Sequence, residues 1–296
     1  MSRRRERGVA LFAAVSALAV LSVVAVGLAR TTIVDQRLTT NALAALQADA
    51  LARSGVAIAA TLIGETSGLP DTLRAPWAQS AGPQSLGAGW VEVRVEDEAR
   101  RLDLNDPALG SAIPRLLDAL ALDPALADAL ADWTDDDDVP RAHGGERDWY
   151  LTRAAPSLPA NGPLASVGEL GRVRGFDADT VARLRPFVTV AGESTVNPNT
   201  APREVLLALL GDAAVVDGLL AARARGALTA ESLPALVPNE DARRLLAPRS
   251  LHYSVRAVAG VGEVRRAVEA TLSAPGGSEA QIVAWRAVLP DDEPLR

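Results

Sequence analysis

The sequence predicts an α+β fold with a long N-terminal helix and a small antiparallel sheet, interrupted by a large all-helical insertion. Three observations predict it. An apolar N-terminal segment continues into residues 28–54, which contain neither glycine nor proline. Apolar and polar residues alternate at 90–95 and again in 251–258, 263–272 and 281–288, the last after a Gly-Gly turn at 276–277. Between these strands, short alanine- and leucine-rich segments are broken by prolines, and because the strands are too few to stand apart, we expect one sheet.

The composition excludes several classes of protein chemistry. The chain has 296 residues, 48% of them hydrophobic, so it can bury a core. Its 37 acidic and 30 basic residues give a net charge of -7, which disfavours a nucleic-acid partner. It has no lysine, no cysteine and two histidines, His143 and His252. A Walker lysine, a thiol nucleophile and a zinc-protease helix are therefore excluded, and we expect that the protein is not an enzyme.

The N-terminal segment has the properties of a membrane span. Residues 9–29 carry no charge, and a helix of that length reaches about 30 Å, the thickness of the hydrocarbon core. Four arginines precede it, and such basic flanks stay in the cytoplasm, so the rest of the chain is expected outside. A cleaved signal peptide is the alternative, although its apolar run is usually shorter.

Helix-forming residues continue beyond the span, so we expect one helix over residues 9–63. Its first half would lie in lipid or a helical bundle, and its second half would pack one face on a globular domain. The apolar positions at helical spacing in that second half include Val34, Leu38, Leu43, Leu46 and Ala50.

The helical region contains a weak internal repeat of two short helices joined at a glycine, Gly175 in one copy and Gly211 in the other. This pattern is typical of the helix-hairpin-helix, which many DNA binders use, and a membrane-anchored DNA-binding protein is the alternative function. The second glycine of such a turn lets backbone amides approach a phosphate. Here Asp177 or Ala213 replaces it, with Asp212 beside Ala213, and a carboxylate at those amides opposes phosphate binding.

The densest charged segment is 133–150, which contains four consecutive aspartates. Adjacent carboxylates repel one another unless water, a cation or arginine compensates them. Calcium takes six to eight oxygen ligands, which a loop rich in aspartate with a later glutamate can supply. An EF-hand counted from Asp135 fails, because Val139 and Pro140 stand at its fifth and sixth positions. Spacing alone leaves a different calcium loop and a merely solvated acidic loop equally open.

The sequence around Gly8 and Val9 resembles the prepilin-peptidase site of type IV pilins and type II secretion pseudopilins. Residues 5–13 read Arg-Glu-Arg-Gly, then Val-Ala-Leu-Phe-Ala. The resemblance implies that the peptidase cuts after Gly8 and that Val9, the new N-terminus, is methylated. These families usually have an aromatic residue first in the mature chain and glutamate fifth, where this chain has Val9 and Ala13. The minor pseudopilin K family also lacks that glutamate.

An ordered set of motifs resembles the minor pseudopilin K family (general secretion pathway protein K) through nearly the whole chain. The motifs are Trp-x-Asp-x-Asp from 133, Gly-x-Glu-x-x-x-Tyr from 144, Pro-Leu-Ala-Ser-Val-x-Glu-Leu from 163 and Asn-x-Asn-Thr-Ala from 197. The resemblance implies a pilin-like fold with an inserted helical domain that binds calcium. It implies as candidate metal ligands Asp135, Asp137, Glu146 and Asp148. We expect Asn197 and Asn199 to cap or brace a turn.

The resemblance also implies a division of the chain and a role. The parts are a cleaved cytoplasmic leader at 1–8, the transmembrane part of the helix at 9–29, the first part of the pilin-like domain at 30–105, an inserted helical domain with helix-hairpin-helix-like repeats at 106–249, and the C-terminal strands of the pilin-like domain at 250–296. The implied role is that of a minor pseudopilin at the tip of the periplasmic pseudopilus of the type II secretion system, supporting protein export across the outer membrane. The implied partners are minor pseudopilins I and J, the prepilin peptidase and the inner membrane, crossed once with the C-terminal domain in the periplasm.

Overall fold

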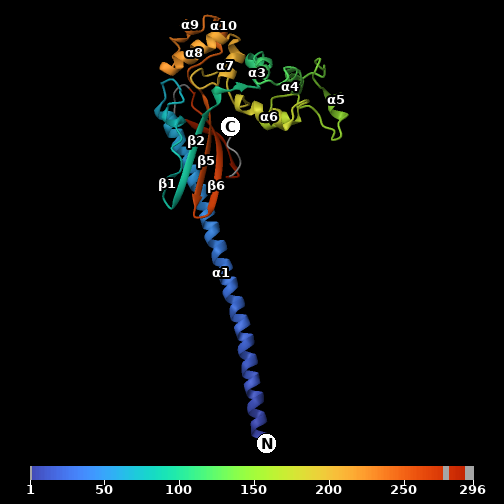
Figure 1. Cartoon of the computed structure of the whole chain (residues 1–296), viewed down its shortest axis with the longest axis vertical. Coiled ribbons are helices and arrows are strands. Elements are labelled where there is room, and N and C mark those ends of the chain that lie inside the picture. Colours follow the sequence, from blue (N-terminus) through green and yellow to red (C-terminus); the bar gives the residue numbers. More distant parts are fainter. Residues whose placement is uncertain (1, 276–279, 291–296) are drawn as a thin grey trace.

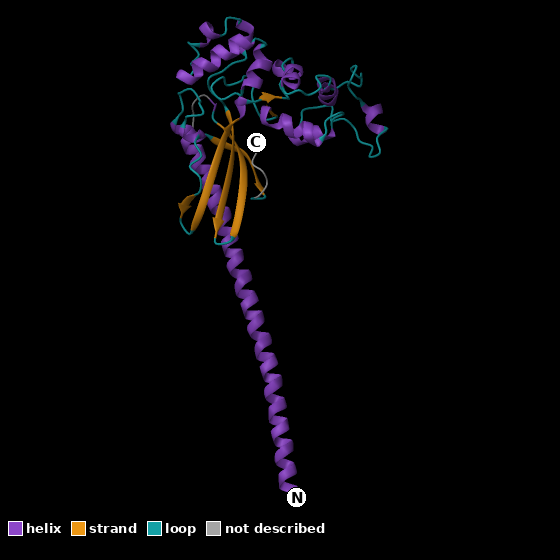
Figure 2. Cartoon of the chain, viewed as in Figure 1, coloured by secondary structure: helices purple, strands orange, loops and turns teal. Residues whose placement is uncertain are grey.

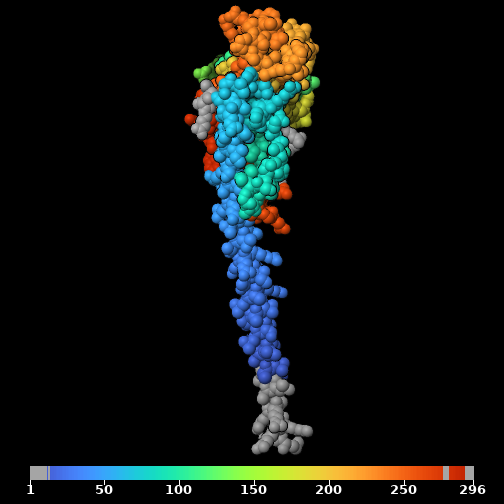
Figure 3. Space-filling view, turned by 90° about the vertical axis from the view of Figure 1, so that its left-hand side faces the viewer, coloured from blue at the N-terminus to red at the C-terminus, as the bar shows by residue number. Residues whose placement is uncertain are grey.

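Helix α1 (Ser2–Glu65) has 64 residues and carries the rest of the protein on its C-terminal part (Figure 1). At 1.5 Å per residue it is about 96 Å long, and its N-terminal part leaves the folded body as a bare rod (Figure 3). The computed structural model describes residues 2–275 and 280–290, without the side chains of 2–11 and 13. The predicted turn at Gly276 and Gly277 lies outside the described residues.

The face of α1 that packs on the sheet is short and is built largely from small residues. Its buried positions recur every three or four residues, at Ala48, Ala52, Val56, Ala59 and Ile63. This is the spacing of one helix face. Because alanine has a small side chain, the helix can lie close against the strands.

The apolar positions predicted for the second half of the helix are not the packing face. The described side chains of α1 before Ala44 are all exposed, because the sheet covers only the C-terminal part of the helix. Val34, Leu38 and Leu43 are therefore exposed. Leu46 and Ala50 are exposed because each lies about 200° around the helix from a buried alanine two residues later.

Five strands form one antiparallel sheet in the order β1-β2-β5-β6-β7 (Figure 2). Their bounds are β1 (Gln84–Leu86), β2 (Gly89–Asp97), β5 (His252–Val261), β6 (Val264–Ser273) and β7 (Gln281–Val288). The four strands predicted from alternation are confirmed, while β1 has only three residues and was not predicted. Val91, Val255, Ala257 and Val268 face α1 and form the core of this part with it.

A helical region joins β2 to β5 and extends sideways beyond the sheet, at the end of the molecule farthest from the N-terminus (Figure 1). Its helices are α2 (Pro107–Gly110), α3 (Ile113–Ala119), α4 (Leu126–Thr134), α5 (Arg147–Leu151), α6 (Ala178–Leu184), α7 (Arg203–Leu210), α8 (Ala213–Arg225), α9 (Leu233–Leu236) and α10 (Glu240–Arg244). It has its own hydrophobic cluster around Leu116, Trp133, Tyr150 and Leu206. The expected α+β class is confirmed.

Some short strands and 3-10 helices are not predicted by the sequence pattern. Strands β3 (Leu102–Asp103) and β4 (Val188–Thr189) pair in parallel, so the region expected to be all-helical also holds a two-residue strand. Short 3-10 helices occur at η1 (Pro76–Ala78), η2 (Glu98–Arg100), η3 (Val167–Arg172) and η4 (Arg185–Phe187). Two residues are too few to show an alternating pattern.

A buried hydrogen-bond network ties the helical region to the sheet. Asn197 Nδ2 donates to the carbonyl oxygen of Asp71 at 3.0 Å and to Asp97 Oδ2 at 2.9 Å, and Thr200 Oγ1 donates to Asp97 Oδ2 at 2.5 Å. Burial raises the pKa of Asp97 to about 6. Asn197 Oδ1 accepts from the N–H of Asn199 at 3.0 Å, so the expected bracing of a turn is confirmed for Asn197. The side chain of Asn199 instead bonds to the backbone N–H and C=O of Leu228, at 2.8 and 3.0 Å. The side chain of Asn197 also joins three separate segments of the chain.

Two glycines of α1 should respond oppositely to alanine. A Cβ at Gly55 would lie 2.8 Å from Val91 Cγ2 and 2.9 Å from Val93 Cγ2, whereas a Cβ at Gly64 would meet nothing within 4 Å. We expect Gly55→Ala to lower the free energy of unfolding by about 1–2 kcal/mol, because overpacking outweighs the gain in helix propensity. Gly64→Ala is the control and should raise it by up to about 1 kcal/mol.

Urea unfolding of a chain that begins at Arg30 measures both effects, since the buried hydrophobic residues start at Ala48. Equal stabilisation by the two substitutions would show that α1 does not pack this closely on the sheet.

Candidate metal centre

Three of the four side chains expected as metal ligands meet at one point. Asp135, Asp137 and Glu146 each offer an oxygen, and these three oxygens all lie within 4.8 Å of one another. Two oxygens bound to the same calcium ion at about 2.4 Å can be at most about 4.8 Å apart. The spacing therefore fits a shared cation with oxygen ligands.

Two helix ends position the outer members of this group. Asp135 directly follows α4, and its backbone N–H still bonds to the carbonyl oxygen of Ala131 at 2.9 Å. Glu146 directly precedes α5, where its extended backbone makes the turn into the helix and its side chain caps nothing. The loop between them, 136–145, brings the carboxylate after one helix to the carboxylate before the next.

Within this group, Glu146 has no cationic partner among the described residues. Glu146 is only 4% exposed. Among the described residues, neither of its carboxylate oxygens nor Asp135 Oδ1 has a hydrogen-bond partner. Burial, and then the nearby charges of Asp132, Asp135, Asp138 and Asp137, raise the pKa of Glu146 to about 7. A buried carboxylate without a partner is costly, and a cation bound by these oxygens would remove that cost.

Arg141 neutralises only part of the cluster. Its Nη1 donates to Asp132 Oδ1 at 2.7 Å and to Asp135 Oδ2 at 2.5 Å, and both bonds raise the pKa of the guanidinium. Asp132 is fully buried and also accepts the backbone N–H of Arg141 at 3.1 Å. A Cβ at Gly144 would lie 1.9 Å from Asp132 Oδ2, so this position requires glycine. Glu146 is left without a cationic partner.

Sequence reasoning missed Asp132 and Arg141. The signal for Asp132 was its position three residues before Asp135, which places both on one face of a helix. Arg141 gave no such signal, because only the loop geometry brings it back to the helix.

Asp148 lies outside the group. It is exposed in the first turn of α5, while the backbone before that helix is extended. Side chains two residues apart point the same way in an extended segment, but about 200° apart around a helix axis. Asp148 could therefore join Glu146 in one site only if the chain after Glu146 stayed extended. Here the helix begins at Arg147.

Buried aromatic residues fix both ends of the loop. Trp133 and Tyr150 are fully buried, with their ring centroids 5.1 Å apart in an edge-to-face arrangement. Trp133 Nε1 donates to Glu169 Oε1 at 3.2 Å, and Glu169 Oε2 accepts the backbone N–H of Ala165 at 2.9 Å. Three sequence motifs, from 133, 144 and 163, therefore meet at this one site.

The helix starts in the repeat are already occupied by carboxylates. Asp177 Oδ1 accepts the N–H of Thr180 at 2.8 Å, at the start of α6. Asp212 Oδ1 accepts the N–H groups of Ala214 at 2.8 Å and Val215 at 3.2 Å, at the start of α8. The amides that a phosphate would need are thus capped by negative side chains.

The long helix, the sheet wrapped on its end and the inserted helical region with an acidic loop define a pilin-like protein. Among the described residues, α1 is the one helix long and apolar enough to cross a membrane by length and composition. A family model described as type II secretion system (T2SS), protein K matches residues 95–193.

Several proteins named type II secretion system protein K are similar to the chain. The protein from Klebsiella pneumoniae is 30% identical over 234 residues, 70% of each chain. The protein from Pseudomonas aeruginosa is 32% identical over 247 residues, 75% of this chain and 74% of the relative. The chain belongs to the type II secretion system protein K family.

A solved structure shares the fold. It is that of the GspK-GspI-GspJ complex from the enterotoxigenic Escherichia coli type 2 secretion system, with a TM-score of 0.68 and 21% identity, covering 86% of this chain and 99% of the other. The expected family is confirmed, and these similarities give no support to the DNA-binding alternative.

Proposed function

We propose that the chain is a minor pseudopilin at the tip of the periplasmic pseudopilus, supporting protein export across the outer membrane. The observation that carries the tip position is the placement of the helical region. It lies at the end farthest from the N-terminus and projects sideways beyond the sheet (Figure 1). In a fibre whose subunits stack along their long helices, this overhang obstructs the subunit that would come next. A structural role in a cap follows, rather than a catalytic one.

The proposed partners are minor pseudopilins I and J, and the proposed contact is α1. Family membership supports this choice, and the similar solved structure is a complex of GspK with GspI and GspJ. Beyond the apolar span, Leu38, Leu43 and Leu46 remain 63%, 56% and 70% exposed. Apolar side chains on a helix that leaves lipid need other helices to cover them. The span itself would anchor the chain in the inner membrane, with the folded part in the periplasm.

We also propose that calcium binds Asp135, Asp137 and Glu146, with further oxygens from backbone or water. The donor set is all oxygen, which hard cations prefer. Calcium would supply the positive charge that Arg141 does not bring to Glu146, and it would tie the end of α4 to the start of α5. Its role here would be to fix the shape of the overhang.

Co-purification with I and J tests the proposed function. The full chain in detergent should bind the two pseudopilins, and Leu43→Asp with Leu46→Asp should weaken binding by roughly 100-fold, because two leucines lose their cover. Leu158→Asp is the matched control, since Leu158 is 54% exposed and lies in the helical region. A folded chain that fails to bind either pseudopilin would argue against the proposal.

A further inference from the structure

Among the described residues, strand β7 pairs with β6 alone and forms an open edge of the sheet. It is the last strand in the order β1-β2-β5-β6-β7, and its residues 281–287 are all exposed. The opposite edge is β1, which has only three residues. Proteins usually protect sheet edges with short strands, prolines or several charged side chains. β7 has eight residues, no proline and a single charged residue, Arg286.

The side chains of β7 are apolar on both faces of the sheet. Ile282, Val283 and Trp285 are 53%, 59% and 48% exposed. The guanidinium of Arg53, on α1, lies 3.6 Å from the centre of the Trp285 ring. Along its outer edge such a strand offers backbone N–H and C=O groups that pair with no other described strand, together with apolar surface above and below them. Only another extended strand can both hydrogen-bond to these backbone groups and cover the apolar surface beside them.

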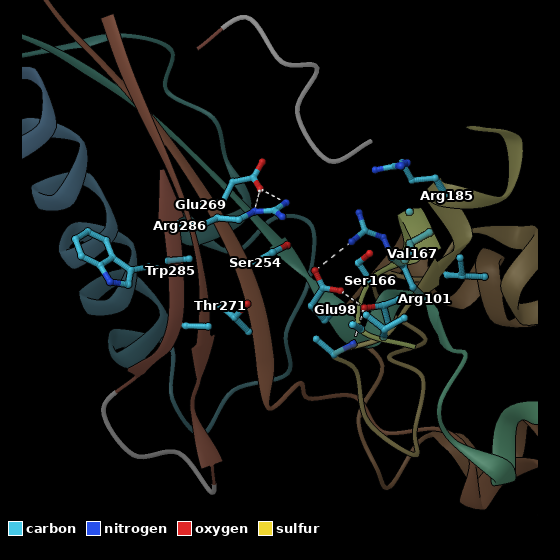
Figure 4. Close-up of a pocket in the computed structure, with 18 residues that line it drawn as sticks. Glu98, Arg101, Ser166, Val167, Arg185, Ser254, Glu269, Thr271, Trp285 and Arg286 are labelled. Carbon is cyan, nitrogen blue, oxygen red and sulfur yellow. Dashed lines mark hydrogen bonds and ion pairs between the residues drawn. The ribbon is translucent and has the colours of Figure 1, made fainter. Parts of the chain in front are cut away.

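A cleft of about 480 Å³ adjoins β7 and separates the sheet from the helical region. Thr271 and Arg286 lie on the sheet side of it, and Ser166, Val167 and Arg185 face them from the helical side (Figure 4). A strand added to β7 would run along the mouth of this cleft. Its side chains on that face would then point between the two walls.

The cleft carries a small positive charge in an acidic protein. Its lining holds three arginines, Arg101, Arg185 and Arg286, against two glutamates, Glu98 and Glu269, a balance of +1. Arg286 Nη2 bonds to Glu269 Oε2 at 2.8 Å, and Arg101 Nη1 bonds to Glu98 Oε1 at 3.1 Å. Both glutamates are thereby neutralised. Within the described part of the chain, Arg185 has no carboxylate partner, and it favours an acidic group in the cleft.

We propose that a partner pseudopilin adds an extended strand to the outer edge of β7 and places an acidic side chain opposite Arg185. The inference rests on the proposed function, because assembly brings such partners beside the chain. A helix cannot satisfy the backbone groups of a sheet edge, so the occupant is a strand. A second copy of this chain is disfavoured, because it would bring its own Arg286 to a site that already has excess positive charge.

Two measurements on the full chain in detergent, free and bound to I and J, test the proposal. Because the chain has no cysteine, Val283→Cys gives a single thiol, and we expect its maleimide labelling to slow at least tenfold on assembly. Leu158→Cys, far from the edge in sequence and outside the cleft, should label at an unchanged rate. Amide hydrogen exchange over 281–288 should also slow at least tenfold, because the outward N–H groups gain partners. Arg185→Glu should weaken the complex about tenfold.

The outcomes separate this proposal from the function on which it rests. If no complex with I and J forms, the proposed function fails. If the complex forms but amide hydrogen exchange at 281–288 is unchanged, strand addition is wrong. This holds even if maleimide labelling of Val283→Cys slows, because a side-chain contact alone can cover the thiol. Protection of the chain alone that grows with its concentration would identify a second copy as the occupant. If the amides of 281–288 are already protected in the free chain and lose this protection when residues 291–296 are deleted, that segment is the occupant of the edge. Either of these two results overturns the proposal.

Discussion

Replacing Gly8 by valine should leave the chain unprocessed at its full length of 296 residues. The resemblance to a prepilin-peptidase site places the cut directly after a glycine. We expect the peptidase to accept only glycine at this position, so the branched side chain of valine should prevent cleavage. The chain that carries no substitution should instead be cleaved and begin at N-methylated Val9. Removing 1–8 takes away four arginines and one glutamate, so 30 minus 37 becomes 26 minus 36, and the net charge falls from -7 to -10.

Mass spectrometry of the intact protein from inner membranes measures this directly. Gly27→Val is the matched control, because Gly27 lies in the same apolar helix and a Cβ there would meet nothing within 4 Å. That variant should be processed normally. If the chain without any substitution keeps Met1, or is cut after Ala29, pseudopilin processing is refuted. The side chains around this cut lie outside the described residues.

Calcium should raise the melting temperature of a chain beginning at Arg30 by roughly 5–10 °C. A cation at about 100 times its dissociation constant stabilises the folded state by about 2.7 kcal/mol. For a chain of this size each kcal/mol moves the melting temperature by about 2–4 °C. The physical source is the buried Glu146, whose carboxylate oxygens have no hydrogen-bond partner among the described residues.

Glu146→Gln should remove the calcium response. In EDTA this variant should melt no lower than the unchanged chain, because the neutral amide no longer repels Asp135 and Asp132. Asp148→Asn is the matched control, since Asp148 is exposed and lies outside the group of three, and it should keep the full response. If calcium and EDTA give the same melting curves for the unchanged chain, the acidic loop is merely solvated.

The two proposals meet in the helical region. The acidic loop lies there, and the same region forms one wall of the cleft beside β7. Calcium that fixes the loop would therefore hold the overhang that obstructs the next subunit. The buried network around Asn197 and Asp97 joins the helical region to the sheet through direct hydrogen bonds.

Periodic features could be predicted from the sequence because they depend on neighbours a few residues apart. Alternation gave β2, β5, β6 and β7, and the absence of glycine and proline over 28–54 gave the continuous helix. Features that depend on distant segments could not be predicted in this way. The packing face of α1 consists of small and apolar residues between Ala48 and Ile63, and none of the predicted positions from Val34 to Ala50 belongs to it. Only the position of the sheet decides which turns and which face of the helix are covered.

The metal group shows the same division. An acidic loop with a later glutamate was enough to suggest Asp135, Asp137 and Glu146, which the structure brings together. Spacing did not show that α5 begins at Arg147 and leaves Asp148 outside the group, nor that Arg141 returns to Asp132.

The sequence by itself determined the class of the protein, since hydrophobic period, helix-forming residues and an ordered set of motifs are local properties that survive without coordinates. Only the tertiary structure decided which carboxylate lacks a cationic partner, which edge of the sheet stays open and where the overhang lies. Burial and charge balance are sums over segments far apart in the chain, and the folded arrangement alone brings those segments together.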